Sequence, residues 1–176
     1  MAELHIIGQL LCAYKFPKQN LFCKWHVQYG NNWTVIAGHA EGQTQVDSSE
    51  YNETCYWYHP IDILFASKGI KGWPKIHIQV FHLDWVGRVH LFGYGYLNIP
   101  TSPGVHKVDC HSWRPIGSLK DRITQYFLGG TSQLKYPDLI CSSLERYKLK
   151  TEAMGIVEFE LGIIFRHFDK FGVQYK

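Results

Sequence analysis

Short segments in which hydrophobic and polar residues alternate run along most of this chain. A period of two is typical of β-strands, because successive side chains point to opposite faces of a sheet. In the clearest segment, hydrophobic residues stand at positions 76, 78 and 80, with Lys75, His77 and Gln79 between them. The pattern predicts about eight strands, over Leu4–Leu11, Phe22–Tyr29, Trp33–Ala37, Tyr56–Phe65, Ile76–Phe81, Gly93–Ile99, Val105–Cys110 and Ile156–Phe165.

Two of these predicted strands have a distinctive neighbourhood. Trp33–Ala37 follows Gly30-Asn31-Asn32, so we expect it to form a hairpin with the strand before it. Pro60 interrupts the strand over Tyr56–Phe65. Because proline has no N–H to donate to a sheet, that strand is expected to bulge or to lie at an edge there.

One segment departs from the alternation. In Ser118–Gly130, Leu119, Ile123, Tyr126 and Phe127 fall on one helical face. Ser118 is a favourable N-cap, and the glycine pair at the end supplies a C-terminal stop. We therefore expect a helix over about residues 119–128. The fold class predicted is all-β, an antiparallel β-sandwich of about eight strands with this one helix inserted.

Composition narrows the class of protein. The chain has 176 residues, of which 45% are hydrophobic and 15% aromatic, which is enough for a sizeable core in one domain. A formal net charge of +3 is too small to indicate nucleic-acid binding. No apolar run approaches the length of about 18 residues that a membrane span requires. The five cysteines are odd in number and form no CxxC, which predicts buried, reduced thiols in a cytoplasmic protein, at Cys12, Cys23, Cys55, Cys110 and Cys141.

The loop His82–Val89 lies between two predicted strands and is open to three interpretations. It could be a metal site, a membrane contact or a plain connection. Calcium requires six to eight oxygen ligands, several from carboxylates, and this loop supplies Asp84 alone. We expect Asp84 instead to accept hydrogen bonds from loop amides or to pair with Arg88.

The sequence gives little evidence for a zinc site or for a catalytic Cys–His pair. His82 with His90, or Cys110 with His111, lacks the spacing of zinc ligands, and adjacent residues on a strand point to opposite faces. Cys55 and a histidine four residues later would meet on a helix, whereas this segment is predicted to be a strand. The sequence therefore predicts no catalytic residue, no bound metal and no cofactor.

A basic, aromatic segment is the strongest candidate for a contact surface. In the Lys68–Lys75 segment, Lys68, Lys71 and Lys75 flank Trp73. Each lysine near an anionic surface contributes about 1 kcal/mol, which favours a contact with anionic lipid or with an acidic partner. Two further lysines, Lys15 and Lys18, lie in the loop between the first two predicted strands and are candidates for the same role. We call them the first-loop lysines. The alternative is a solvated turn whose tryptophan packs into the core.

Two stretches resemble the strand, loop and strand units of C2 domains. They are LHIIGQLLCAYKFPKQNLFCKW, from Leu4, and IHIQVFHLDWVGRVHLFGYGYLNI, from Ile76. Calcium-binding C2 domains carry aspartates in their first and third loops. The resemblance places the corresponding positions at Asn20, His82, Asp84 and His90, of which one is acidic. It therefore implies a C2-like fold that works without calcium.

A set of shorter motifs is more specific. In order, they are EGQTQVD (Glu41–Asp47), HPID (His59–Asp62), FASKGIKGWP (Phe65–Pro74), GYGYLNIP (Gly93–Pro100), SPG (Ser102–Gly104), WRPIGS (Trp113–Ser118) and the ending FELGIIFRHFDKFGV. Through these motifs the chain is similar to the B9-domain family over nearly its whole length. The resemblance implies a single B9 domain over residues 1–168 and a C-terminal tail over 169–176.

The resemblance also implies a function. B9-domain proteins are non-enzymatic parts of the Meckel syndrome, or tectonic-like, complex of the ciliary transition zone, which supports cilium assembly and limits diffusion of membrane proteins. The implied partners are B9 domain-containing protein 1 and the Meckel syndrome type 1 protein, and the implied location is the cytoplasm, cytoskeleton and ciliary basal body. Two hypotheses follow. The chain is an interaction module for other B9 domains, or it is a peripheral module that binds anionic phospholipid through basic loops.

Overall fold

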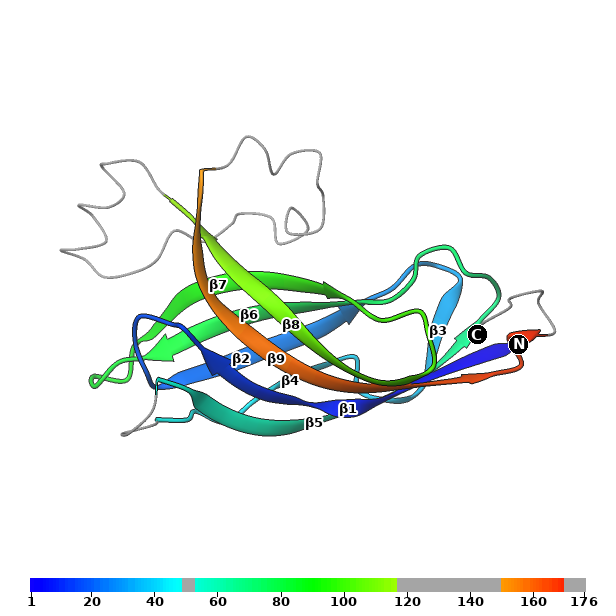
Figure 1. Ribbon diagram of the computed structural model, residues 1–176. Helices are drawn as coiled ribbons and strands as arrows, with labels where there is room; N and C mark the ends of the chain where they lie inside the picture. Colours follow the sequence, from blue (N-terminus) through cyan, green and yellow to red (C-terminus); the bar gives the residue numbers. More distant parts are fainter. Residues whose placement is uncertain (49–52, 117–149, 170–176) are drawn as a thin grey trace.

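The structure is a computed structural model that describes residues 1–48, 53–116 and 150–169 (Figure 1). The elements named in these ranges are nine strands that form one curled antiparallel sheet in the order β3-β5-β1-β9-β8-β7-β6-β2-β4. Their bounds are β1 Ala2–Tyr14, β2 Leu21–Gln28, β3 Trp33–Gly38, β4 Glu41–Gln43, β5 Cys55–Ser67, β6 Lys75–Leu83, β7 Val89–Asn98, β8 Gly104–Pro115 and β9 Thr151–Arg166.

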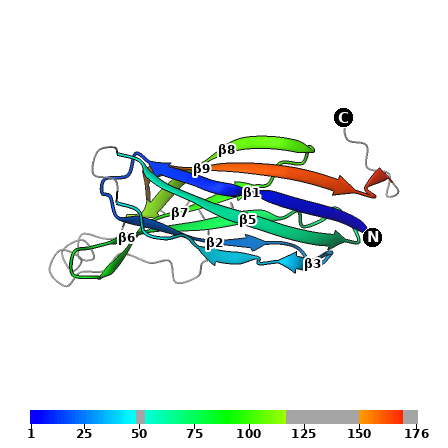
Figure 2. The same cartoon turned by 90° about the horizontal axis from the view of Figure 1, so that it is seen from below.

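The sheet folds over on itself into two layers. Strands β5, β1, β9 and β8 run side by side in one layer (Figure 2), and β7, β6, β2 and β4 make the other. The layers are joined where Tyr94 of β7 pairs with Trp113 of β8. Between them lies the larger of two hydrophobic clusters found among the described residues, to which both layers contribute fully buried side chains such as Leu4, Ile6 and Ile78.

Alternation along each strand decides which side chains enter this core. In β2, Cys23, Trp25 and Val27 are buried while the residues between them are exposed. Each of the eight predicted strands overlaps an observed strand, although several observed strands extend up to five residues beyond the predicted bounds, so the all-β prediction is confirmed. The ninth strand, β4, has three residues, which is too short for a periodic pattern to reveal.

The predicted hairpin between the second and third strands is wrong. β3 pairs with β5, beginning with Trp33 opposite Ser67, whereas β2 pairs with β4 and β6. The turn between them packs closely on a distant loop, because Gly30 N donates to Gly72 O at 2.9 Å. A Cβ on Gly30 would lie 2.7 Å from the Cα of Gly72, so a side chain there would block this approach.

Both alternatives expected for Pro60, an edge position and a bulge, are confirmed. The ladder between β3 and β5 ends at Ile63, so this proline has β1 as its neighbour on one side and lies at a local edge. Next to it, the β1–β5 register shifts between His59 and Tyr56, and Tyr58 takes a left-handed φ of 46°. This is the geometry of a bulge.

Part of the sequence prediction falls outside the described residues. The helix expected over 119–128 lies there, as does the chain from residue 170 onward. Within the described ranges, no helix has the length and hydropathy of a membrane span.

Candidate functional site

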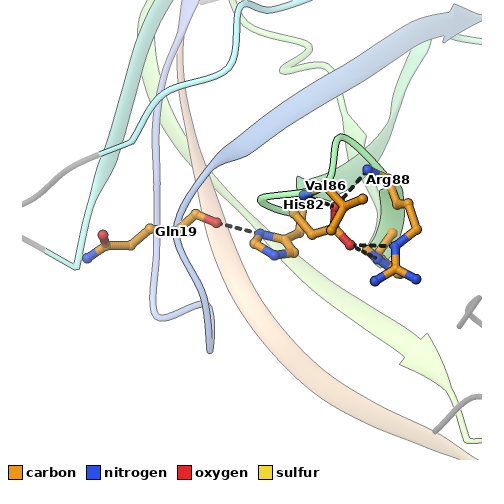
Figure 3. Close-up of polar contacts among 6 residues, drawn as sticks. Gln19, His82, Val86 and Arg88 are labelled. Carbon is orange, nitrogen blue, oxygen red and sulfur yellow. Dashed lines mark hydrogen bonds and ion pairs between the residues drawn. The ribbon is translucent and has the colours of Figure 1, made fainter. Parts of the chain in front are cut away.

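The four positions that resemble calcium ligands meet at one end of the sheet. The loop between β1 and β2 lies against the β6–β7 hairpin, where His82 Nδ1 is 2.6 Å from the carbonyl oxygen of Gln19 (Figure 3). Beside this contact, Leu83 N donates to the carbonyl of Asn20 at 2.9 Å. The structure thus brings the first and third loops together, as the C2 resemblance implies.

Asp84 is fully engaged within its own hairpin. Its Oδ1 accepts from the amides of Val86 at 3.0 Å and Arg88 at 2.7 Å. Its Oδ2 contacts Arg88 Nε at 2.8 Å and His90 Nε2 at 3.2 Å. Both roles predicted for this aspartate, acceptor of loop amides and partner of Arg88, are therefore present.

These contacts set the charge of the hairpin. Partial desolvation alone would raise the pKa of the Asp84 carboxyl, but the amide and guanidinium of Arg88, with His90 and the Val86 amide, hold that pKa well below its usual range. The carboxylate is thus ionised and already bound by hydrogen-bond donors. A cation at this point would have to displace Arg88.

The other three positions that resemble calcium ligands do not supply an oxygen cage. Asn20, His82 and His90 carry no carboxylate. Among the described residues, no three His, Cys, Asp or Glu side chains gather closely enough to hold a metal ion. Burial lowers the pKa of the His82 imidazole, and although the Gln19 carbonyl opposes this, Lys18 adds to it. Hydrogen bonds within the hairpin and to the β1–β2 loop therefore hold this end of the sheet in place. Calcium independence remains a prediction.

The two groups of candidate lysines lie at opposite ends of the sheet (Figure 1). Ala2, at the start of β1, pairs with Ser67, which immediately precedes the Lys68–Lys75 segment. The first-loop lysines follow Tyr14, at the other end of the same 13-residue strand. The structure therefore does not combine Lys15 and Lys18 with Lys68, Lys71 and Lys75 into one surface.

Trp73 is partly buried and packs against the hydrophobic core, which is close to the alternative that placed it inside the core. Its Nε1 donates to Ile99 O at 2.9 Å, and its ring centroid lies 5.1 Å from that of Trp33 and 6.0 Å from that of Phe165. The loop around it is also fixed, since Trp33 Nε1 donates to Lys71 O at 3.1 Å. Lys68 and Lys71 remain exposed, and their role as contacts remains a prediction.

Sequence reasoning did not single out the apolar side chains at the tip of the β6–β7 hairpin, within the loop His82–Val89. There Trp85 is 94% exposed, and Val86 and Val89 are about half exposed; we call these three residues the hairpin tip. A turn closes beneath them, in which Gly87 N donates to Asp84 O at 3.0 Å. Large apolar residues are unusual in the middle of a turn, where polar residues and glycine dominate, so this signal was present in the sequence.

A second missed feature lies on the outer face of the layer formed by β1, β8 and β9. Ile7, Val105 and Ile164 are 42%, 73% and 47% exposed on that face. Gly162 lies between them, because it pairs with Ile7 on one side and with Val105 on the other. We call Ile7, Val105, Gly162 and Ile164 the outer patch.

Polar pairs border the outer patch. His5 Nε2 lies 2.7 Å from Asp62 Oδ1, and Arg166 donates to Glu3 at 3.3 Å. On the third side, Gln9 Nε2 donates to Glu160 Oε2 at 3.0 Å. An apolar centre with a polar border is the anatomy of a protein interface.

The described cysteines are buried, as predicted. Cys12, Cys23, Cys55 and Cys110 are free thiols inside the structure, and Cys141 lies outside the described residues. Burial raises the pKa of Cys110 to about 12; burial, with the nearby Glu158 carboxylate, raises that of Cys12 to about 11. Thiols with such pKa values are protonated at neutral pH and are poor nucleophiles.

Comparison with known proteins agrees with the motifs. The family model "B9-C2: Ciliary basal body-associated, B9 protein" matches residues 4–164. B9 domain-containing protein 2 of Danio rerio is 53% identical over 174 residues, and that of Homo sapiens is 46% identical, each match covering 99% of both chains. B9 domain-containing protein 1 of Xenopus laevis is 29% identical, over 96% of this chain and 87% of that protein.

Among solved structures, the C2A domain of plant Extended Synaptotagmin 1 superposes with a TM-score of 0.46 at 13% identity, covering 92% of this chain and 93% of that one. On the family match and the full-length identities, this chain belongs to the B9-C2 family of non-enzymatic, ciliary basal body-associated proteins.

Proposed function

We propose that this chain is a scaffold component of the Meckel syndrome, or tectonic-like, complex at the ciliary transition zone. There it binds other B9-domain proteins without calcium and supports cilium assembly and the barrier to membrane-protein diffusion. We further propose that residues 1–168 act as a single B9 domain. The observation that carries the scaffold role is the outer patch, an exposed apolar surface on a rigid sheet.

The position of the outer patch favours a flat partner. It spans three adjacent strands, and the alternation of β1 and β9 fixes the outward direction of Ile7 and Ile164, because Ile6 and Ile163 are buried on the opposite face. Gly162 leaves a dip between Ile7 and Val105 that a partner side chain can fill. A sheet face of another sandwich is flat in the same way, and this supports packing of one B9 domain against another.

The proposed partners are B9 domain-containing protein 1 and the Meckel syndrome type 1 protein. The 29% identity between this chain and a B9 domain-containing protein 1 supports a common fold for the two, and so a sheet-on-sheet interface. The polar border supports specificity, because its ion pairs contact the partner but add no apolar area to the interface. Exposed ion pairs of this kind contribute about 0–1 kcal/mol each, so the patch itself supplies the affinity.

Co-expression of the three chains followed by affinity purification tests this proposal. The double substitution Val105→Arg with Ile164→Arg is expected to reduce recovery of both partners, because it buries two charges in an apolar interface. Ile36→Arg is the matched control, since Ile36 is 53% exposed on β3, outside the patch. Normal recovery with the double variant, or no recovery with the parent chain, would overturn the proposal. Recovery in a calcium chelator is expected to equal recovery with calcium.

A further inference from the structure

We propose that the outer face of β7 and β8 is an internal docking surface, covered by the apolar side of the segment 117–149 of this same chain. This goes beyond the scaffold role, because it assigns an occupant to a second apolar face and leaves the outer patch for other B9-domain proteins. The face is a hydrophobic cluster separate from the main core. We call it the aromatic face; its centre is Leu91, Tyr94 and Trp113, with Phe81 and Tyr96 packed beside them.

The register of the strands turns these side chains away from the main core. On β7, Gly95 pairs with Ile78, and a Cβ on this glycine would lie 2.8 Å from Cys110 Sγ, inside the main core. Tyr94 is the preceding residue of the same strand, so its ring points to the opposite side of the sheet. There it pairs with Trp113 of β8, and the two ring centroids are 5.9 Å apart. The aromatic face therefore lies outside the two-layered sheet.

This outward-pointing face is nevertheless as deeply buried as the core. Leu91, Tyr94 and Trp113 are 4%, 3% and 5% exposed, whereas Val105 and Ile164 of the outer patch are 73% and 47% exposed. The nine described strands belong to one sheet whose two layers face each other, so none of them forms a third layer over the aromatic face. Its cover therefore comes from elsewhere in the chain or from another molecule.

The chain leaves the sheet and returns to it beside this face. β8 ends soon after Trp113, and the residue that follows the strand, Ile116, donates its N–H to Lys150 O at 2.8 Å, just before β9 begins. Both ends of the segment 117–149 are thereby fixed next to each other. Because an extended residue spans at most about 3.5 Å, the first residues of the segment have to lie close to Trp113.

The sequence of this segment suits an apolar surface. The helix expected over 119–128 carries four apolar or aromatic residues on one side, Leu119, Ile123, Tyr126 and Phe127. Its opposite side carries Asp121 and Gln125, which suit water. Such a helix would be about 15 Å long, about three times the distance between neighbouring strands, which is enough to cover β7 together with β6 and β8. A helix of this kind gains most of its stability by packing its apolar side on a surface.

A second copy of the chain or a partner protein is the alternative occupant. The tether favours the segment, because its two fixed ends hold it at a high effective concentration beside the aromatic face. A separate molecule would lose translational and rotational freedom on binding, and it would have to displace the segment first. The aromatic face is therefore assigned to the chain itself.

Photo-cross-linking of the purified full-length chain tests this proposal. Tyr96, which is partly buried beside the cluster, is replaced by p-benzoylphenylalanine, and mass spectrometry identifies the linked peptides. We expect links to residues 117–149 of the same chain. The same replacement of Tyr58 is the matched control, since this tyrosine is 59% exposed on β5, in the other layer, and should give no such links. Links from position 96 to a second copy, or none to the segment, would overturn the proposal.

Hydroxyl-radical footprinting measures the exposure of the aromatic face directly. In the parent chain its three central side chains should be labelled as little as Trp57, a core residue that is 3% exposed. Ile123→Ser with Phe127→Ser should raise their labelling several-fold and leave Trp57 unchanged. The matched control, Asp121→Ser with Gln125→Ser, changes the opposite side of the expected helix and should leave the labelling low.

The footprinting result can contradict the proposal in two ways. Strong labelling of the aromatic face in the parent chain would assign that face to another protein. Equal labelling in the two double variants would show that the apolar side of the segment does not cover it. If labelling of Trp57 also rises, the variant has unfolded, and the cross-link from position 96, which needs no destabilising change, decides.

Discussion

The Nδ1 atom of His82 lies 2.6 Å from the carbonyl oxygen of Gln19, which joins the β6–β7 hairpin to the loop between β1 and β2. A carbonyl oxygen can only accept, so Nδ1 carries the hydrogen of this bond. The ring also stacks on Phe92, with centroids 5.0 Å apart. His82 therefore occupies a position that resembles a calcium ligand, but it fastens the two loops to each other by a hydrogen bond.

Stability is expected to fall as the pH drops below about 6.5, in part because of His82. Burial lowers the pKa of this imidazole from 6.5 in the folded protein. Between the lowered value and 6.5 the unfolded chain binds a proton that the folded chain does not, so the free energy of unfolding rises with pH across this window. Urea unfolding at a series of pH values measures the effect.

In that experiment His82→Gln should flatten the pH profile, since glutamine does not titrate and its amide can donate to the Gln19 carbonyl. Burial lowers the pKa of His59 as well, so a smaller slope of the same sign should remain. His39→Gln, at an exposed position, is the control. A profile for His82→Gln parallel to that of the parent chain would contradict the prediction.

Substitutions of Asp84 should separate its two roles. Asp84→Asn keeps an oxygen for the amides of Val86 and Arg88 but loses the charge that attracts the Arg88 guanidinium. Asp84→Ala loses both. We expect hydrogen exchange of these two amides to be faster in Asp84→Ala than in Asp84→Asn, and slowest in the parent chain. Equal exchange in all three proteins would show that the carboxylate does not hold the hairpin.

The indole of Trp57 ties the two layers together, because its Nε1 donates to the carbonyl of Leu21 at 3.1 Å. Trp57→Phe should lower the free energy of unfolding by about 1–2 kcal/mol, from one lost hydrogen bond and a smaller ring. The loss of stability should be no larger, because the Leu21 carbonyl still accepts a hydrogen bond from Asp47 N and is not left unsatisfied. Chemical denaturation measures it, with Tyr58→Phe, at an exposed position, as the control. An unchanged midpoint for Trp57→Phe would count against the role of this bond.

A side chain at Gly155 is expected to destabilise the protein. A Cβ there would lie 2.3 Å from the ring of Phe16, and Ser112 Oγ fixes the glycine backbone through both its N–H and its carbonyl. Gly155→Ala should therefore cost about 1–3 kcal/mol of stability by overpacking. Adding Phe16→Leu should recover part of this loss, so that the double variant is more stable than the sum of the single effects predicts.

Thermal denaturation of the single and double variants checks the Gly155 prediction. Gly69→Ala is the control, because the nearest atom to its Cβ would be the flexible amide of Asn32 at 3.3 Å. Strictly additive effects of Gly155→Ala and Phe16→Leu would show that the two positions do not share the clash.

Much of this fold could be predicted from the sequence, because a strand that packs one face on a core alternates residue by residue. The alternation along β2 and β6 therefore located the strands, and the family motifs identified the chain. The sequence did not predict β4, because three residues are too few to show a period of two. The sequence did not predict the pairing of β3 with β5, because it joins residues far apart in the sequence, such as Trp33 and Ser67.

The sequence by itself determined that Asp84 is the one carboxylate among the four positions that resemble calcium ligands, since ligand chemistry depends on residue type. Only the tertiary structure decided where the candidate contacts lie. It separated the first-loop lysines from Lys68 and Lys71, turned Trp73 inward and left Trp85 in solvent. The reason is physical. Alternation tells which side of a strand is polar, but exposure depends on what the rest of the chain packs against it, and no local pattern records that.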